Sequence, residues 1–212
     1  MNGIACRSPV LILEGFGDRE AVPFLIREIF TQQNVFDFNP LSNPIINQNA
    51  PKLLAAGQLE RMIGYAQKRD GDSILIILDA DKDCPVNIAR DFFQRLSNME
   101  LGKKTGLIIF NSEFEVLFLY CLDLIAGKYD YGWELGDWDP LTNFEDVAGA
   151  KGLITRHMKP GKSYKETRDQ AKFVSVLDFD RLRERSRCFR HLESTLNWLA
   201  GAGEGMVYPT FE

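Results

Sequence analysis

The stretch from Ser73 to Asp83, SILIILDADKD, decides the fold class. It joins a continuous apolar run to three aspartates at positions 79, 81 and 83. A short run without polar interruption is typical of a parallel strand, because both faces of such a strand are covered and neither meets water. The aspartates would then follow at the carboxyl end of this strand.

Two more apolar runs repeat this arrangement along the chain. PVLIL at residues 9–13 precedes Glu14 and Asp18, and GLIIF at residues 106–110 precedes Glu113 and Glu115. A weaker strand is expected around Ile45–Ile46. Helical spacing of apolar residues predicts helices from near residue 22, over 51–69, over 86–99 and over 116–127. Strands alternating with helices predict an α/β fold, a parallel sheet flanked by helices.

The pattern changes after residue 126. Helical stretches are expected around 143–158, 164–176 and 187–200, and no strand-like run separates them. No segment is rich enough in Pro, Gly or Ser to act as a flexible linker. We therefore expect an α/β core over residues 1–126 and a mainly helical extension, residues 127–212, packed on it.

Composition narrows the class of protein. The 212 residues are 45% hydrophobic and 26% charged, as in an ordinary globular protein, and the net charge is -5. An acidic chain without runs of like charge is not expected to coat nucleic acid by electrostatics alone. The four cysteines show no CxxC pairing, which argues against a zinc site and suits a reducing cytoplasm. Neither a signal peptide nor a membrane-spanning apolar stretch is present in the sequence, so a cytoplasmic protein without membrane association is expected.

The carboxylates that follow the strands form the candidate site. The carboxyl ends of parallel strands lie along one edge of a sheet, where open α/β folds bind ligands. Carboxylates gathered there repel one another unless cations neutralise them, and oxygen-only ligands select Mg²⁺ or Mn²⁺. Each residue alone has a simpler interpretation: Asp18 as a helix cap, for example. The candidate metal ligands are Glu14, Asp18, Asp79, Asp81, Glu113 and Glu115.

Four segments, in this order, resemble a known family. LILEGFGD, ILDADKDCP, NSEFEVLFL and SRCFRHL are similar to segments of a Toprim-like family of unknown function, found beside ABC-type ATPases in phage-defence loci. The related Toprim nucleases of the overcoming-lysogenisation-defect type carry comparable acidic elements. The resemblance implies a Toprim-like fold, a metal held by Asp79 and Asp81, and Glu14 as general acid or base or as a further metal ligand. It also implies an ABC-type ATPase as a possible partner.

The third acidic element is less well matched. Ser112 is followed by both Glu113 and Glu115, and we favour Glu113 as the ligand because it is nearer the strand end, with Glu115 close behind. Basic residues outside the acidic set are candidates for contacts with phosphate. Lys162 is the candidate for stabilising charge in the transition state, and the candidates for binding phosphate are Lys159, Lys165, Arg187 and Arg190.

Size separates the activities known for Toprim-like proteins. A topoisomerase needs a separate DNA gate and a primase needs template-handling modules, and 212 residues leave no room for either. Metal-dependent hydrolysis of phosphodiester bonds in DNA or RNA remains, with Mg²⁺ or Mn²⁺ as cofactor and with control by a partner ATPase. Two alternatives stay open: a regulatory or interaction subunit that binds metal without turnover, and a phosphohydrolase acting on nucleotides.

Overall fold

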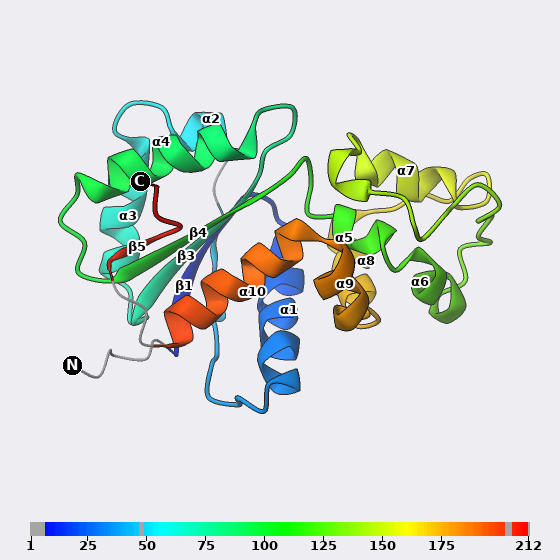
Figure 1. The fold of residues 1–212 in the computed structure, drawn as a ribbon, viewed down its shortest axis with the longest axis horizontal. Helices are drawn as coiled ribbons and strands as arrows, with labels where there is room; N and C mark the ends of the chain where they lie inside the picture. The colour runs from blue at the N-terminus through cyan, green and yellow to red at the C-terminus, as the bar shows by residue number, and fades with distance from the viewer. Residues whose placement is uncertain (1–6, 47–48, 202–204, 212) are drawn as a thin grey trace.

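A five-stranded parallel sheet forms the centre of the protein (Figure 1). The computed structural model describes residues 7–46, 49–201 and 205–211. The strand order is β2-β1-β3-β4-β5, and every neighbouring pair is parallel. The strands are β1 (Pro9–Leu13), β2 (Ile45–Ile46), β3 (Ser73–Asp79), β4 (Lys104–Phe110) and β5 (Val207–Tyr208). The α/β class predicted from the sequence is confirmed, and the arrangement is consistent with a Toprim-like fold.

Both faces of the sheet are buried, which explains the uninterrupted apolar runs. In β1, Leu11 and Leu13 belong to one hydrophobic cluster, whereas Val10 and Ile12 belong to the other. Successive side chains of a strand point to opposite faces, so each face receives every second residue. The long register between β3 and β4, from Ser73 opposite Lys104 to Asp79 opposite Phe110, fixes where both strands end.

Helices cover the two faces of the sheet. Helices α1 and α10 lie on one face, and α2, α3 and α4 lie on the other (Figure 1). Their bounds are α1 (Asp18–Gln32), α2 (Ala50–Leu53), α3 (Gln58–Gln67), α4 (Pro85–Ser97) and α10 (Arg187–Ala200). The helix expected over 51–69 is divided: α2 ends at Leu53, and α3 begins after Gly57, whose left-handed backbone (φ 71°) is not helical.

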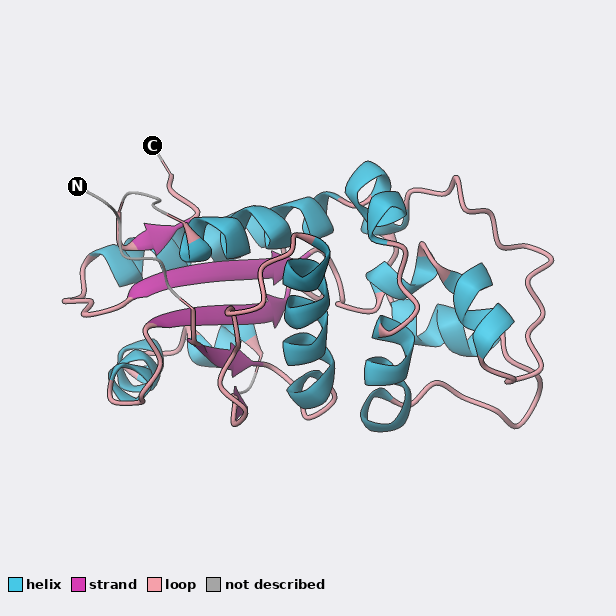
Figure 2. Ribbon diagram, turned by 90° about the horizontal axis from the view of Figure 1, so that it is seen from below, coloured by secondary structure: helices cyan, strands magenta, loops and turns pink. Residues whose placement is uncertain are grey.

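The remaining helices form a lobe beyond the carboxyl ends of the strands, which point toward it (Figure 2). This lobe consists of α5 (Val116–Leu119), α6 (Leu122–Lys128), η1 (Phe144–Asp146), α7 (Ala150–Arg156), α8 (Glu166–Val174) and α9 (Phe179–Arg185). One continuous hydrophobic cluster joins the lobe to the sheet, with Phe118 and Phe173 packed edge to face at its centre. The mainly helical extension is thus present.

The chain after residue 126 does more than extend the core. Helix α10 returns to pack on β4, and β5 adds a strand to the sheet. Meanwhile α5 belongs to the lobe, although it precedes residue 126. The apolar helix expected over 116–127 is interrupted at Cys121, whose backbone (φ -124°) is not helical. The domain boundary at residue 126 stays a prediction, although α5 from before it lies in the lobe and α10 and β5 from after it pack on the sheet.

Candidate carboxylate site

Hydrogen bonds tie together the loops that follow β1, β3 and β4. The Glu14 carboxylate accepts a hydrogen bond from the Asp79 backbone N–H through Oε2 at 3.1 Å. The Asp79 carboxylate in turn accepts one from the Phe114 N–H through Oδ1 at 2.9 Å. Residues 65 and 35 positions apart in the chain therefore meet at one edge of the sheet. The convergence of the strand ends that the sequence suggested is present in the fold.

Asp18 connects this edge to the helical lobe. It is the first residue of α1, but it does not cap that helix. Its Oδ2 accepts from the Gly15 N–H at 3.0 Å, and its Oδ1 accepts from Gln170 Nε2 on α8 at 2.8 Å. Asp18 therefore does not act as a helix cap but links the loop after β1 to α8 through two hydrogen bonds.

Gly17 allows α8 to approach the start of α1. A Cβ atom at this position would lie 2.3 Å from Gln170 Oε1 and 2.6 Å from Glu166 Cβ. Both distances are shorter than van der Waals contact, so only glycine fits without movement of α8. The glycine in LILEGFGD is therefore required by packing between distant segments.

Glu115 is the deeply buried member of the third acidic element. Its side chain is 1% exposed, and Oε1 accepts a hydrogen bond from the Tyr164 hydroxyl at 2.9 Å. Its other oxygen, Oε2, is buried and has no hydrogen-bond partner. Glu113 is 16% exposed, and its Oε2 accepts from the Lys151 backbone N–H at 3.3 Å. The sequence-based preference for Glu113 stays a prediction, but the buried oxygen without a hydrogen bond belongs to Glu115.

Lys151, near the start of α7, is the cation of the site. Its Nζ lies 2.8 Å from Glu166 Oε1, 3.8 Å from Glu115 Oε2 and 3.9 Å from Glu113 Oε1. Burial alone would lower the pKa of Lys151, but the surrounding carboxylates, Glu115 first, raise it above its ordinary value. Lys151 is therefore held in its charged form. No motif marks Lys151 or Glu166 in the sequence, since both reach the site only through packing of the lobe.

Four carboxyl groups at this edge bind their protons more tightly than usual. Burial raises the pKa of Glu14, Asp18 and Asp79, and neighbouring carboxylates raise it further. Burial likewise raises the pKa of Glu115 to about 8, against the lowering influence of Lys151 and Tyr164. Several negative charges close together in a partly buried site repel one another, and a bound cation would neutralise them.

The donor atoms fit a hard divalent cation, but they are not preassembled around one. All are carboxylate oxygens, which Mg²⁺ prefers, and Glu115 Oε2, which accepts no hydrogen bond, offers a buried acceptor. Asp81 is exposed and has a left-handed backbone (φ 52°), with its N–H donating to the Ser112 carbonyl at 2.9 Å. Within residues 7–46, 49–201 and 205–211, no three His, Cys, Asp or Glu side chains form a ready coordination group. Metal binding would require side-chain rotations.

The basic residues singled out in the sequence lie elsewhere. Lys159, Lys162 and Lys165 are exposed between α7 and α8, and in the described part of the chain none forms an ion pair with these carboxylates. Arg190 donates to the carbonyls of Arg183 and Glu184 at the end of α9. The structure brings Lys151 to the carboxylates, whereas a role of Lys162 in catalysis stays a prediction.

Arg187 also lies outside the carboxylate site. It lines a cavity beside β4 together with Cys188 and His191. Its predicted contact with phosphate would therefore not be made at the carboxylates.

Comparisons with known proteins leave the chain without an assigned family. It matches no protein-family model, and no curated protein or solved structure matches it significantly. Among the described residues, the helices are too short or too polar to cross a membrane.

Proposed function

We propose that the chain is a divalent-metal-dependent nuclease that hydrolyses phosphodiester bonds in DNA or RNA. The observation that carries this proposal is the hydrogen-bonded series from Glu14 to Asp79 to the Phe114 N–H, which joins two carboxylates and a backbone N–H from three strand ends. The raised pKa of Glu14 and Asp79 supports it, because such groups gain most from a bound cation.

The proposed metal-binding residues are those at the centre of the edge. Asp79, Asp81 and Glu115 would hold Mg²⁺ or Mn²⁺, with Asp18 and Glu113 at its margin. When bound, the ion would supply Lewis acidity and lower the pKa of a water molecule. An all-carboxylate set leaves such an ion with coordination positions for phosphate oxygens.

Glu14 and Lys151 have separate proposed roles. Glu14 uses Oε2 to accept from the Asp79 N–H, so its Oε1 remains able to take or give a proton. Burial raises the pKa of Glu14, so its carboxyl group holds a proton more readily than an exposed one, as a general acid or base requires. Lys151 keeps its charge among Glu113, Glu115 and Glu166, orients those side chains, and adds a positive charge next to an incoming phosphate.

The decisive experiment compares Asp79→Asn with the unaltered protein. Single- and double-stranded DNA and RNA are incubated with the purified chain in Mg²⁺, Mn²⁺ or EDTA. Cleavage should require the metal and should fall by about 100-fold or more in Asp79→Asn, because loss of even a hydrogen-bond partner of a metal ligand typically costs about 10–100-fold. Asp91→Asn, on the exposed side of α4, is the matched control and should cleave normally. Equal cleavage by Asp79→Asn would refute the proposal.

One observation favours the non-catalytic alternative. Lys151 already neutralises part of the acidic cluster from within the chain, as expected of a subunit that binds metal without turnover. That alternative predicts a Mn²⁺-dependent rise in melting temperature with no cleavage of any nucleic acid. A phosphohydrolase would instead release phosphate from nucleotides and leave strands intact.

Control by a partner ATPase is a further part of the proposal. The resemblance to proteins encoded beside ABC-type ATPases suggests it, and the net charge of -5 suggests weak binding to nucleic acid by the chain alone. Addition of such an ATPase with ATP should then raise the cleavage rate at a fixed metal concentration.

A further inference from the structure

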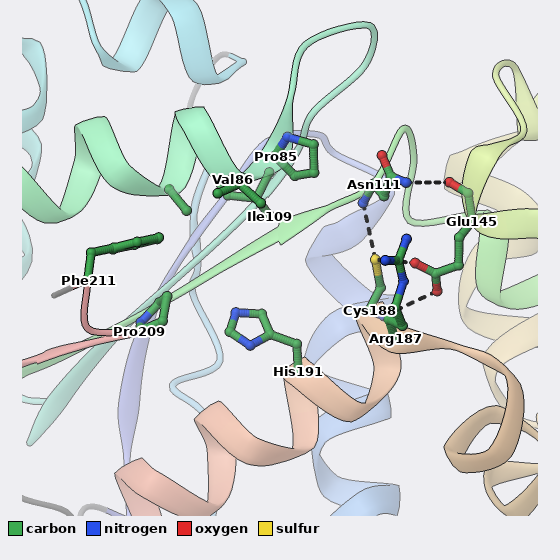
Figure 3. Close-up of a pocket in the computed structure, with 11 residues that line it drawn as sticks. Pro85, Val86, Ile109, Asn111, Glu145, Arg187, Cys188, His191, Pro209 and Phe211 are labelled. Atoms are coloured by element: carbon green, nitrogen blue, oxygen red, sulfur yellow. Dashed lines mark hydrogen bonds between the residues drawn. The ribbon is translucent and has the colours of Figure 1, made fainter.

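A cavity of about 330 Å³ opens beside β4, on the side away from β3 (Figure 3). Its apolar wall comes from the start of α4, from β4 and from the segment that follows β5. Its polar end comes from η1 and the start of α10. The lining of the cavity includes Val86, Asn111, Glu145, Arg187, His191 and Phe211.

The cavity exists because β5 is too short to cover β4. β5 pairs only with Thr105 and Gly106, so none of the described strands lies beside β4 beyond Gly106 on that side. His191 makes a hydrogen bond to the Leu107 backbone at the start of this uncovered stretch. Further along, Ile109 forms part of the cavity wall. The space is thus bounded by a strand edge, which offers main-chain hydrogen-bonding groups as well as apolar surface.

The aromatic wall is held in place by its own contacts. The Phe211 ring packs against Phe93 of α4 with centroids 5.6 Å apart, and the Arg90 guanidinium lies 5.7 Å from its centre. Opposite the polar end, Val86 is 52% exposed although it lines the cavity. A fixed aromatic ring and an exposed apolar side chain in one cavity suit a flat, largely apolar group.

The buried carboxylate at the polar end is already in use. Glu145 is 2% exposed, and its Oε1 accepts from Ser186 Oγ at 2.6 Å and from the Cys188 N–H at 3.2 Å. Its Oε2 accepts from the Cys188 thiol at 3.1 Å. Asn111 Nδ2 donates to the Glu145 carbonyl at 2.6 Å. Arg187 is the charged group of the lining that remains exposed, so its guanidinium is available to an anionic group of a ligand.

The cavity shares two loops with the carboxylate site. The segment that carries Asp79 and Asp81 leads directly into the start of α4, which supplies Val86. Asn111 stands immediately before Ser112, whose carbonyl accepts from the Asp81 N–H at 2.9 Å. A ligand that fills the cavity therefore lies next to the loops that carry the candidate metal ligands.

We propose that this cavity binds the base of a nucleotide adjacent to the phosphodiester bond at the carboxylate site, with Arg187 contacting a phosphate of the same strand. The base would lie between Val86 and Phe211, and its polar edge would face the end lined by Asn111 and His191. The volume is at the lower end of the range for small-molecule sites, about 300–1,000 Å³, which suits one nucleoside. The placement beside the scissile bond rests on the proposed nuclease function, whereas binding of a nucleotide does not.

The first experiment measures nucleotide binding without catalysis. Adenosine, guanosine, cytidine and uridine 5′-monophosphates are titrated into the full chain in EDTA by calorimetry, so that no metal bridges phosphate to the carboxylates. At least one should bind, and Val86→Trp, which fills the cavity, and Arg187→Ala should each weaken binding by about fivefold or more. Leu141→Trp and Arg61→Ala, at exposed sites outside the cavity, are the matched controls and should bind normally.

Three outcomes would overturn the proposal. They are no binding of any mononucleotide at millimolar concentration, equal binding by both cavity variants, and equally tight binding of benzoate, which would show only a general preference for apolar anions. Melting temperatures of the variants are measured in parallel, because Val86→Trp and Arg187→Ala replace exposed side chains and should leave stability unchanged. If one variant unfolds, the other still decides the outcome.

The second experiment places the cavity relative to the cleaved bond. Short single strands carrying one abasic residue at successive positions are cleaved by the unaltered protein and by Val86→Trp. An abasic residue at one of these positions should raise the KM of the unaltered protein about fivefold or more. The same abasic residue should not raise the KM of Val86→Trp, because that variant binds no base in the cavity. A penalty unchanged in Val86→Trp would refute the base site while leaving the nuclease intact. Absence of all cleavage, with mononucleotide binding still lost in the variants, would refute the nuclease and leave the nucleotide site.

Discussion

Replacing Asp169 with alanine should loosen the helix that carries the lobe's contacts to the carboxylate site. Asp169 lies in α8, is fully buried, and accepts hydrogen bonds from the Tyr131 hydroxyl at 2.6 Å and from the Lys165 N–H at 2.8 Å. It also pairs with Arg168, whose side chain is 46% exposed. The same helix carries Glu166, which pairs with Lys151, and Gln170, which donates to Asp18.

The size of the effect follows from which partners lose their acceptor. The Tyr131 hydroxyl and the Lys165 N–H each lose a hydrogen bond to a charged acceptor, worth about 1.5 kcal/mol each. Arg168 remains hydrated without Asp169, so it adds little. Asp169→Ala should therefore lower the free energy of unfolding by about 3 kcal/mol, or the melting temperature by about 6–12 °C in a chain of this size. Asp169→Asn keeps one acceptor and should lose about half as much.

The dependence on pH gives an independent check. Burial alone would raise the pKa of Asp169, but hydrogen bonds from Arg168, Tyr131 and Lys165 outweigh it and hold the pKa below 3.8, the ordinary value. A lowered pKa contributes stability above the unfolded-state pKa, and that contribution disappears as the pH falls through the folded-state value. The loss of unfolding free energy caused by Asp169→Ala should thus be complete at pH 7 and should become smaller below about pH 4.

Urea denaturation at pH 7.0 and pH 3.5 measures both quantities. Asp180→Ala, which breaks an exposed ion pair with Arg183, is the control and should leave the midpoint nearly unchanged. A deficit below about 1 kcal/mol for Asp169→Ala, or one equally large at both pH values, would show that the buried hydrogen bonds do not hold α8 in place.

Three further changes test the site itself. Gly17→Ala should destabilise the protein by about 1–3 kcal/mol through overlap with α8, whereas Gly64→Ala, with open space around its Cβ, should stabilise it by a few tenths to about 1 kcal/mol in thermal melts. Lys151→Met should increase the apparent affinity for Mg²⁺ roughly fivefold in thermal titrations, while cleavage falls. This factor corresponds to about 1 kcal/mol, the interaction between two charges near 4 Å apart in water. Unchanged affinity would show that Lys151 does not compete with the metal for the carboxylates. Phe16→Ala, at a side chain that is 70% exposed between Glu14 and Asp18, should keep the melting temperature but weaken binding of single strands by about 1–3 kcal/mol in fluorescence anisotropy.

The sequence alone determined the three long strands β1, β3 and β4 and the acidic edge, but it gave no sign of β5. Strand and helix differ in the period of their apolar residues, and this period is local, so SILIIL and PVLIL identify buried parallel strands without knowledge of their neighbours. Because parallel strands end at one edge, the meeting of Glu14 with Asp79 followed from the same pattern. The weaker strand expected around Ile45–Ile46 is present as the two-residue β2.

Only the tertiary structure decided which side chains complete that edge. Lys151, Glu166 and Gln170 reach the carboxylates because the lobe folds back over the strand ends, and nothing in their neighbouring sequence indicates it. Lys162 lies in a segment with several other lysines, yet its side chain is exposed. In the described part of the chain it forms no ion pair with the carboxylates of the site. The cavity beside β4 likewise depends on β5 pairing with only two residues. Such contacts depend on packing between segments far apart in the chain, and a local pattern of apolar and polar residues carries no record of their partners.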